Sequence, residues 1–311
     1  MLGDPRNVAA VSIMVYNRIV HFQACIESLL KNPLAKLTDL YIFSDGPKSG
    51  DEEAVQKVRD FAGSISGFSS VLLHFQETND FSRNAKDVLS VPLENHERVI
   101  YMEDDNVVSS TFLAFMNEAL EIYRDDPRIA SVSGWAAPVT QSKIYKDDVY
   151  LSQNWSFWTA GVWRDKRVFD FLKFERPYSD MIENRLERRV NRVNPGLPHG
   201  LRKIELGIQH APDRQLTYYL MKYGRYQLRP VKSLVMNTGH DGTGMNSVRS
   251  DRFGYPPFEG DITLPKGGLS YSAAMDRRQY RFLSWRKSRR HQMAKLLRRL
   301  RRTAGLAFIR R

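Results

Sequence analysis

The amino-acid sequence predicts an α/β protein in which a mainly parallel β-sheet is flanked by helices. Over the first hundred residues, short apolar runs alternate with helical patterns, and this alternation is typical of βαβ units. The chain has 311 residues, of which 42% are hydrophobic and 26% are charged. These values are ordinary for globular proteins, so they argue against a disordered chain, a fibrous repeat or a disulfide scaffold.

Four strands are predicted in this first part, at residues 8–16, 40–43, 71–75 and 99–102. Helical patterns separate them at 19–30, from residue 51 onward and at 82–89. The first helix places its apolar side chains, Cys25 among them, on one face. Polar residues follow three of the strands, at 16–18, at Asp45 and at 103–105. Ligands bind at the carboxyl ends of strands in such sheets, so these positions are candidates for a site.

The second half of the chain is less regular. Helices are predicted at 111–124 and 213–223 and a strand at 129–135, whereas residues 136–200 form mostly loops with an aromatic stretch. A glycine-rich element, residues 237–244, follows the apolar residues 234–236. The sequence has one cysteine, which favours a reducing compartment, and no apolar run near the roughly 20 residues of a membrane span. We expect a soluble or peripheral intracellular protein.

Glu103, Asp104 and Asp105 directly follow the strand at 99–102. Three adjacent carboxylates repel one another unless a cation lies among them, and Mg²⁺ and Mn²⁺ prefer such oxygen ligands. Because neighbouring residues of a strand point to opposite faces, alternate carboxylates, or one with a water molecule, would face the same ion. The alternative is a solvated turn whose acids cap the following helix.

Four segments of the chain resemble segments of known glycosyltransferases. VIYMEDDN (99–106), followed by Phe112, Phe115, Asp126-Pro127 and SVSGW (131–135), resembles the metal-binding core of N-acetylglucosaminyltransferase I. VYNR (15–18) resembles the first donor-binding segment of family 2 glycosyltransferases, and NWSFWTAGVW (154–163) resembles their aromatic acceptor-side segment. PVKSLVMNTGHDGTG (230–244) resembles a glycine-rich element of bacterial members. The segments stand in the family order.

The resemblance implies a nucleotide-sugar glycosyltransferase of the GT-A fold with Mn²⁺ or Mg²⁺ as its cofactor. The implied donor contacts are Tyr16, Asn17, Arg18, Asp45, Glu103 and Asp104. The implied metal ligand is Asp105, and His240 is a second candidate because a neutral imidazole can ligate a metal. The implied acceptor contacts are Trp135, Trp158 and Trp163.

Simpler readings of these residues stay open. Asp45 is also a typical turn residue, Arg18 also suits the start of a helix, and the tryptophans also suit a buried cluster. His240 is also a plausible loop histidine, because related bacterial sequences often carry their histidine later, where Asn246 stands here.

Asp213 is the candidate catalytic base. An inverting transferase needs a carboxylate that takes the proton of the acceptor hydroxyl. In the related enzymes this acid begins the helix that precedes the glycine-rich element, and Asp213 occupies that place. The family often has a tryptophan close behind the acid, whereas Gln215 stands here. The alternatives are that Asp213 is an ordinary helix cap and that Asp180, which also begins a helical pattern, is the base.

The positive charge of the chain is concentrated at its C-terminal end. The net charge is +12, yet residues 277–311 contain fourteen Lys and Arg and no acid, so residues 1–276 are nearly neutral. We therefore predict a catalytic domain at 1–276 and a basic amphipathic extension at 277–311. Apolar residues between the charges favour an anionic membrane surface as its partner over nucleic acid, and a solvated end is the simpler alternative.

The predicted function is transfer of a monosaccharide from a nucleotide diphosphate sugar to a glycan or lipid-linked acceptor, with inversion. The predicted place is the cytoplasm, at the inner face of the cytoplasmic membrane. A nucleotidyltransferase also holds Mg²⁺ with acids after a parallel strand, but no N-terminal glycine-rich nucleotide loop is evident. A non-catalytic basic protein that binds membrane or nucleic acid is a further alternative, and it would leave the aligned acids unexplained.

Overall fold

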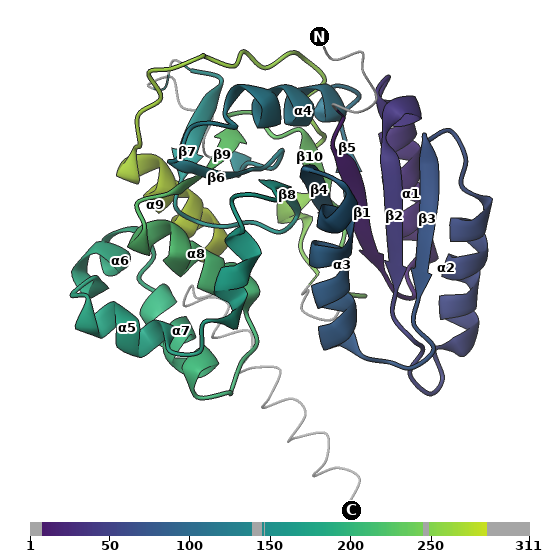
Figure 1. The fold of residues 1–311 in the computed structure, drawn as a ribbon, viewed down its shortest axis with the longest axis horizontal. Helices are drawn as coiled ribbons and strands as arrows, with labels where there is room; N and C mark the ends of the chain where they lie inside the picture. The colour runs from purple at the N-terminus through teal and green to yellow at the C-terminus, as the bar shows by residue number, and fades with distance from the viewer. Residues whose placement is uncertain (1–7, 139–144, 146, 245–248, 285–311) are drawn as a thin grey trace, which may run out of the picture.

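The computed structural model describes residues 8–138, 145, 147–244 and 249–284 (Figure 1). Its centre is an eight-stranded sheet in the order β3-β2-β1-β4-β8-β6-β9-β7. The strands are β1 (Ala10–Val15), β2 (Asp39–Ser44), β3 (Ser70–Phe75), β4 (Arg98–Glu103), β6 (Ile129–Val132), β7 (Val149–Ser152), β8 (Thr159–Trp163) and β9 (Tyr226–Pro230). Four of the seven pairings are parallel, including all those among β1 to β4. The predicted α/β class with a mainly parallel sheet is confirmed.

Helices cover both faces of this sheet. One face carries α1 (Ile19–Leu30), α2 (Glu52–Ser64) and α4 (Phe112–Ile122), and the other carries α3 (Phe81–Asn95) and α8 (Pro212–Lys222). Side chains of β1 point alternately to the two faces of the sheet and so contribute to the hydrophobic core on each face. Val11 and Ile13 pack toward α1, whereas Ala10 packs toward α3. Cys25 of α1 is fully buried in the core, as its position on the apolar face of the predicted helix indicates.

Residues 136–200 contain more regular structure than the sequence predicts. Besides β7 and β8, this region forms η4 (Val168–Lys173), α5 (Pro177–Glu183), α6 (Glu187–Val193) and α7 (Leu197–Glu205). Helices α5 and α7 each begin with a proline in the first turn, a position where proline needs no N–H partner. Prolines occur in loops as well as in the first turn of helices, so short helices of this kind are easily missed in a sequence. The prediction of mostly loops is wrong.

A short two-stranded ribbon joins the acidic triplet to the glycine-rich element. β5 (Asn106–Val108) pairs antiparallel with β10 (Val235–Asn237), and Asn106 stands opposite Asn237. Two segments that are 131 residues apart in the chain therefore meet at the carboxyl end of β4.

Helix α9 (Ala273–Leu283) packs on the sheet domain and spans the predicted boundary after Asp276. The Asp276 carboxylate accepts hydrogen bonds from the Ser152 hydroxyl (2.6 Å) and the Gln153 N–H (2.7 Å) at the end of β7. Within the predicted extension, Gln279 and Phe282 are buried as well. Residues 285–311 of that extension lie outside the described residues, as does Asn246.

Two short 3-10 segments complete the elements, η2 (Ala35–Leu37) and η5 (Asp251–Phe253). Across the described ranges, none of the helices has the length and apolar character needed to cross a membrane.

Candidate active site

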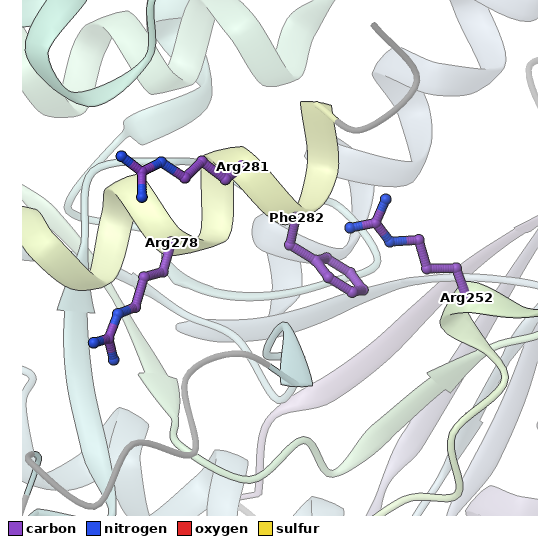
Figure 2. A pocket seen from close by; sticks show the side chains of 4 residues that line it. All are labelled: Arg252, Arg278, Arg281 and Phe282. Atoms are coloured by element: carbon purple, nitrogen blue, oxygen red, sulfur yellow. The ribbon is translucent and has the colours of Figure 1, made fainter. Parts of the chain in front are cut away.

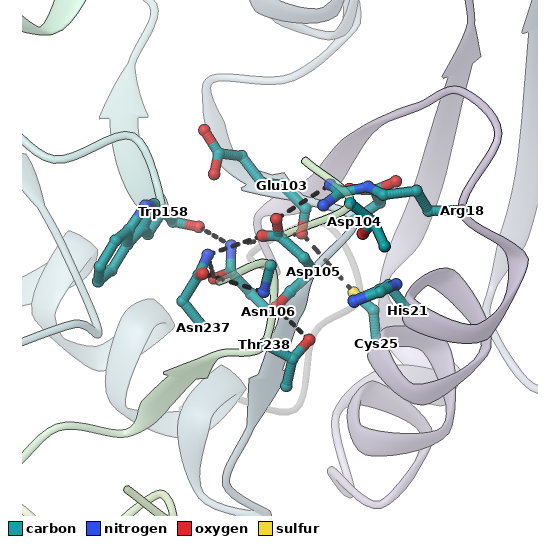
Figure 3. A network of polar contacts seen from close by, with 12 residues as sticks. Arg18, His21, Cys25, Glu103, Asp104, Asp105, Asn106, Trp158, Asn237 and Thr238 are labelled. Carbon is teal, nitrogen blue, oxygen red and sulfur yellow. Dashed lines mark hydrogen bonds and ion pairs between the residues drawn. The ribbon is translucent and has the colours of Figure 1, made fainter. Parts of the chain in front are cut away.

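Arg18 lies against the carboxylates that follow β4. It directly precedes α1, and its guanidinium is hydrogen-bonded to Asp104 and lies 3.0 Å from the Oδ2 atom of Asp105 (Figure 3). Asp104 and Asp105 form the turn between β4 and β5 and are 5% and 7% exposed. This contact brings the ends of two neighbouring parallel strands together, as the sequence predicts.

The site holds more negative charge than one guanidinium balances. Burial raises the pKa of Asp104 to about 7; Asp105 adds to the rise, while Arg18 opposes it. Burial, followed by the charges of Asp105 and Asp104, raises the pKa of Glu103 well above its usual range. Glu103 ends β4, and its carboxylate points away from the Arg18 contact (Figure 3). A cation that binds here replaces repulsion between carboxylates with attraction.

The glycine-rich element forms the second wall of the site. The Asn237 amide donates to Asp105 Oδ1 (2.7 Å) and to Asn106 Oδ1 (3.1 Å), and the N–H and hydroxyl of Thr238 both donate to the Asp105 carbonyl. At Gly239 the backbone comes so close that a Cβ there would lie 1.9 Å from Asp105 Oδ2. Sequence reasoning did not assign a role to Asn237 or Thr238, although both lie in the element that it singled out.

The chemistry of these groups suits a hard divalent cation. Asp105 offers carboxylate oxygens beside two further acids, and Mg²⁺ and Mn²⁺ take oxygen ligands of this kind. Within the described part of the chain, no three His, Cys, Asp or Glu side chains form a group that could hold a metal ion. An ion held through Asp105 therefore needs further ligands from a bound molecule or from water.

His240 belongs to the same glycine-rich element, and its imidazole packs against aromatic rings. Its ring stacks on Phe253 at a centroid distance of 4.1 Å and meets Trp158 edge-on at 5.7 Å. The neighbouring Asp241 pairs with His21 of α1 (3.2 Å). The role of His240 as a metal ligand stays a prediction.

Asp213 lies in the first turn of α8, two residues after the N-cap Ala211. Its side chain is exposed to solvent, yet the surrounding protein raises the pKa of its carboxyl, and Arg214 opposes the rise. Asp213 lies near enough to Glu103 for its charge to raise the pKa of Glu103. The exposed carboxylate of Asp213 therefore lies near the acidic triplet.

The competing acid, Asp180, is already engaged. Its carboxylate lies 2.7 Å from the Lys222 ammonium and accepts a hydrogen bond from the Tyr218 hydroxyl at 2.5 Å. These contacts join α5 to α8, so Asp180 has a structural task.

Three residues predicted to bind the sugar donor, at the carboxyl ends of β1 and β2, form hydrogen bonds with nearby residues of the protein. The Tyr16 hydroxyl donates to Asp51 (2.8 Å), and the Asn17 amide donates to the same carboxylate (3.3 Å). The buried Asp45 carboxylate accepts hydrogen bonds from the N–H groups of Gly46 and Asp80 (2.8 Å each) and from the Asn79 amide (3.0 Å). Asp45 therefore fixes its turn, and donor contact by these residues stays a prediction.

The predicted acceptor tryptophans lie at different depths. Trp158 is partly exposed beside His240, and Trp135 meets it edge-on at 4.4 Å but is only 1% exposed. Trp163 is 2% exposed, and its indole N–H donates to the Leu120 carbonyl of α4 (2.9 Å). The rings of Trp135 and Trp163 are part of the core, and the acceptor roles of the three tryptophans stay a prediction.

No model of a protein family matches the chain, and no curated protein matches it. The chain is similar to several solved structures, at low sequence identity and with TM-scores below 0.5. Mannosyltransferase PcManGT from Pyrobaculum calidifontis, in complex with GDP-Man and Mn²⁺, is 13% identical over 53% of this chain and 46% of its own, with a TM-score of 0.37. Residues 1–349 of S. aureus TarS are 14% identical over 75% of this chain and 61% of the TarS chain, with a TM-score of 0.43. GalNAc-T7 with UDP, GalNAc and Mn²⁺ is 12% identical over 72% of this chain and 43% of its own, with a TM-score of 0.43. The chain spans less than two thirds of the length of each of these solved chains.

Proposed function

We propose that this protein is a metal-dependent glycosyltransferase that takes a monosaccharide from a nucleotide diphosphate sugar. The observation that supports it most is the group of carboxylates after β4, which Gly239 approaches closely and which Arg18 only partly neutralises. A divalent cation supplies the missing positive charge, and a diphosphate bound to that cation supplies the missing ligands. Asp105 would hold the cation, which stabilises the negative charge on the leaving nucleotide diphosphate.

The residues around this group divide into a donor side and an acceptor side. Tyr16, Asn17 and Asp45 lie along the ends of β1 and β2, where the nucleotide would bind. Trp158 lies on the other side, next to the glycine-rich element, where the partly exposed ring would stack on an acceptor sugar. Asp104 would contact the ribose or the donor sugar.

Asp213 would act as the base. Its exposure leaves the carboxylate accessible to an acceptor hydroxyl, and its place near Glu103 puts it beside the proposed donor site. A single base opposite the leaving group gives inversion at the anomeric carbon. A glycan or a lipid-linked glycan is the proposed acceptor, and the basic residues 277–311 would hold the enzyme at an anionic cytoplasmic membrane surface.

The test begins with a thermal-shift screen of nucleotide sugars with Mn²⁺ and Mg²⁺. We expect one donor to raise the melting temperature only with metal, because a ligand that binds the folded state stabilises it. Hydrolysis of that donor is then measured in the wild type and in Asp105→Asn, with EDTA as a second arm. We expect the substitution to lower turnover by about two orders of magnitude or more and to leave the melting temperature without ligand nearly unchanged.

Full hydrolysis in EDTA or in Asp105→Asn would contradict the metal assignment. Release of pyrophosphate from a nucleoside triphosphate, in place of sugar transfer, would favour the nucleotidyltransferase alternative. Binding without any turnover would favour a non-catalytic protein.

A further inference from the structure

The turn between α7 and α8 exposes two large apolar side chains. Leu206 is 61% exposed and Ile208 is 67% exposed, and they stand on either side of Gly207. The apolar face of α7 itself, with Leu197 and Leu201, is buried against α5, α6 and α8. In the part of the chain that the structure describes, Leu206 and Ile208 belong to none of the hydrophobic cores. The packing of the fold therefore does not explain why these two residues are apolar.

The backbone of this turn is fixed by hydrogen bonds. The N–H of Ile208 donates to the Lys203 carbonyl and the N–H of Gly207 donates to the Ile204 carbonyl, both at 2.9 Å, which is the Schellman pattern of a helix end. Gly207 has a φ of +66°, a conformation that favours glycine. In this pattern the residue at the position of Ile208 often packs against the helix, yet here it is exposed. The turn therefore presents both aliphatic side chains on an ordered support.

The charges that remain available at the turn are basic. Arg202 and Lys203 precede it, and neither forms an ion pair with a carboxylate among the described residues. The acid of this segment, Glu205, accepts hydrogen bonds from the N–H groups of Tyr178 and Ser179 in the first turn of α5 (2.9 Å each). Glu205 therefore caps α5, which leaves Arg202 and Lys203 to interact with a partner.

Exposed aliphatic side chains beside Lys and Arg suit the surface of an anionic membrane. The aliphatic groups enter between the lipid headgroups, and the basic groups are attracted by the negative charge of the leaflet. Helices α5, α6 and α7 lie together on the side of the molecule away from α2 and β3 (Figure 1). Helix α6 contacts both α7 and α9, so α7 and the beginning of the basic extension flank the same helix.

Helix α9 provides charge of a different kind. Figure 2 shows the guanidinium groups of Arg278 and Arg281 pointing in different directions, and the ring of Phe282 beside them is buried. Such a surface attracts anionic lipid through its charge. The turn between α7 and α8 provides the aliphatic side chains that enter the lipid.

We propose that the turn at residues 206–208 docks the protein on an anionic membrane surface beside the catalytic base. The inference rests on the proposed function, because it takes Asp213 as that base. Five residues separate Ile208 from Asp213, and a chain of this length spans at most about 18 Å. A membrane that holds Ile208 therefore keeps Asp213 close to the lipid headgroups. Of the two proposed acceptors, this placement favours the lipid-linked glycan.

The test places a polarity-sensitive fluorophore on the turn of the full-length protein. Ile208→Cys provides one accessible thiol, because the chain has a single cysteine, Cys25, which is fully buried. Val20→Cys is the matched control, because Val20 is 72% exposed on α1, away from the turn. With vesicles of phosphatidylglycerol and phosphatidylcholine, we expect the emission of the label at residue 208 to shift to shorter wavelength. The emission of the label at residue 20 should stay unchanged.

Removal of the aliphatic groups gives a second readout. We expect Leu206→Ser/Ile208→Ser to bind the same vesicles at least about tenfold more weakly than the wild type. Val20→Ser/Leu30→Ser removes two exposed aliphatic groups of α1 and should bind as the wild type does. If the first double variant fails to fold, the fluorophore measurement decides alone.

Two results would overturn the proposal. One is cosedimentation of the labelled protein without an emission shift at residue 208, because the basic extension alone would then hold the protein. The other is an emission shift that grows with protein concentration without vesicles, because a second copy of the chain would then cover the turn. Neither measurement needs donor, metal or turnover, so donor hydrolysis by the wild type tests the proposed function separately.

Discussion

At the scale of single residues, Asp105 is held on both of its carboxylate oxygens. Oδ1 accepts the Asn237 amide at 2.7 Å, and Oδ2 faces the Arg18 guanidinium at 3.0 Å. A metal ion at Asp105 would compete with Arg18 for the same oxygen. On the proposed function, we expect donor binding to shift Arg18 away from Asp105 toward the phosphates, the contact that the sequence resemblance implies.

Gly239→Ala tests how closely the glycine-rich element must approach Asp105. The new Cβ would lie 1.9 Å from Asp105 Oδ2 and 2.7 Å from its Cγ, so the carboxylate must move. We expect metal-dependent donor binding, measured by thermal shift, to weaken by about tenfold or more. The free energy of unfolding should fall by about 1–3 kcal/mol, the usual cost of overpacking.

Gly63→Ala is the control for that substitution. Gly63 lies within α2, and a Cβ there meets nothing within 4 Å. Alanine in a helix interior stabilises by roughly 0.5–1 kcal/mol relative to glycine, so this variant should be slightly more stable and bind the donor normally. Normal donor binding in Gly239→Ala would show that the element does not position Asp105.

Asp213→Asn and Asp180→Asn separate the base from the structural acid. Asp213→Asn should keep donor affinity and lose transfer by about a hundredfold or more, because the lost interaction is with the acceptor proton. Asp180→Asn weakens the contact with Lys222 that joins α5 to α8, so it should lower stability and keep transfer activity at permissive temperature. Rates of sugar transfer and denaturant unfolding measure the two effects. An active Asp213→Asn together with an inactive, stable Asp180→Asn would reverse the assignment.

At the scale of elements, α9 is fastened to the sheet by buried polar contacts. Asp276 is fully buried and accepts from Ser152 and Gln153, and Gln279 accepts from the Tyr150 hydroxyl (3.2 Å). These bonds and the buried ring of Phe282 hold the eleven-residue helix against the end of β7.

Asp276→Ala tests this attachment. The substitution leaves a buried hydroxyl and a buried N–H without their acceptor, which costs about 2–3 kcal/mol of the free energy of unfolding. Urea denaturation measures the loss. Arg277→Gln on the exposed side of the helix is the control and should change stability by less than about 0.5 kcal/mol. Unchanged stability in Asp276→Ala would mean that α9 is held by its apolar contacts alone.

Local patterns predicted the first half of the molecule well. The strands β1 to β4 and the helices between them follow from alternating apolar runs, and the carboxyl ends of parallel strands brought Arg18 and the acidic triplet to one edge. The pairing of Asn237 with Asp105 spans 132 residues, so no local pattern signals it. Long-range pairings of this kind depend on the folded topology.

The tryptophans show a signal that the sequence analysis missed. The predicted loop at 154–163 contains strand β8, Thr159–Trp163. Trp163 lies in this strand, whereas Trp158 directly precedes it, so recognising the strand would have placed Trp163 in the sheet and Trp158 at its end.

At the scale of the whole molecule, the charge is divided between a nearly neutral body and a basic end. Residues 277–311 carry fourteen Lys and Arg without an acid. Each basic residue near an anionic leaflet contributes about 1 kcal/mol, so on the proposed function a few of them would suffice to keep the protein at an anionic membrane.

Replacing the arginines beyond Lys287 with Gln tests the membrane role. Cosedimentation with anionic vesicles should fall strongly, and donor hydrolysis should stay near the wild-type rate. High salt should weaken binding of the unmodified protein, because charges are screened beyond roughly 8–10 Å at physiological ionic strength. Vesicle binding that survives these substitutions would leave a solvated end as the better explanation.

The ribbon of β5 and β10 has a consequence for the protein during synthesis. The turn that carries Asp105 is made early, but the amide of Asn237 that bonds to it leaves the ribosome only after a further 132 residues. Until then the emerging chain has the strands β1 to β4 and their acids but not the wall that Gly239 and Thr238 provide. On the proposed function, a chain that ends before Asn237 would lack one wall of the donor site, so donor binding would arise only late in translation.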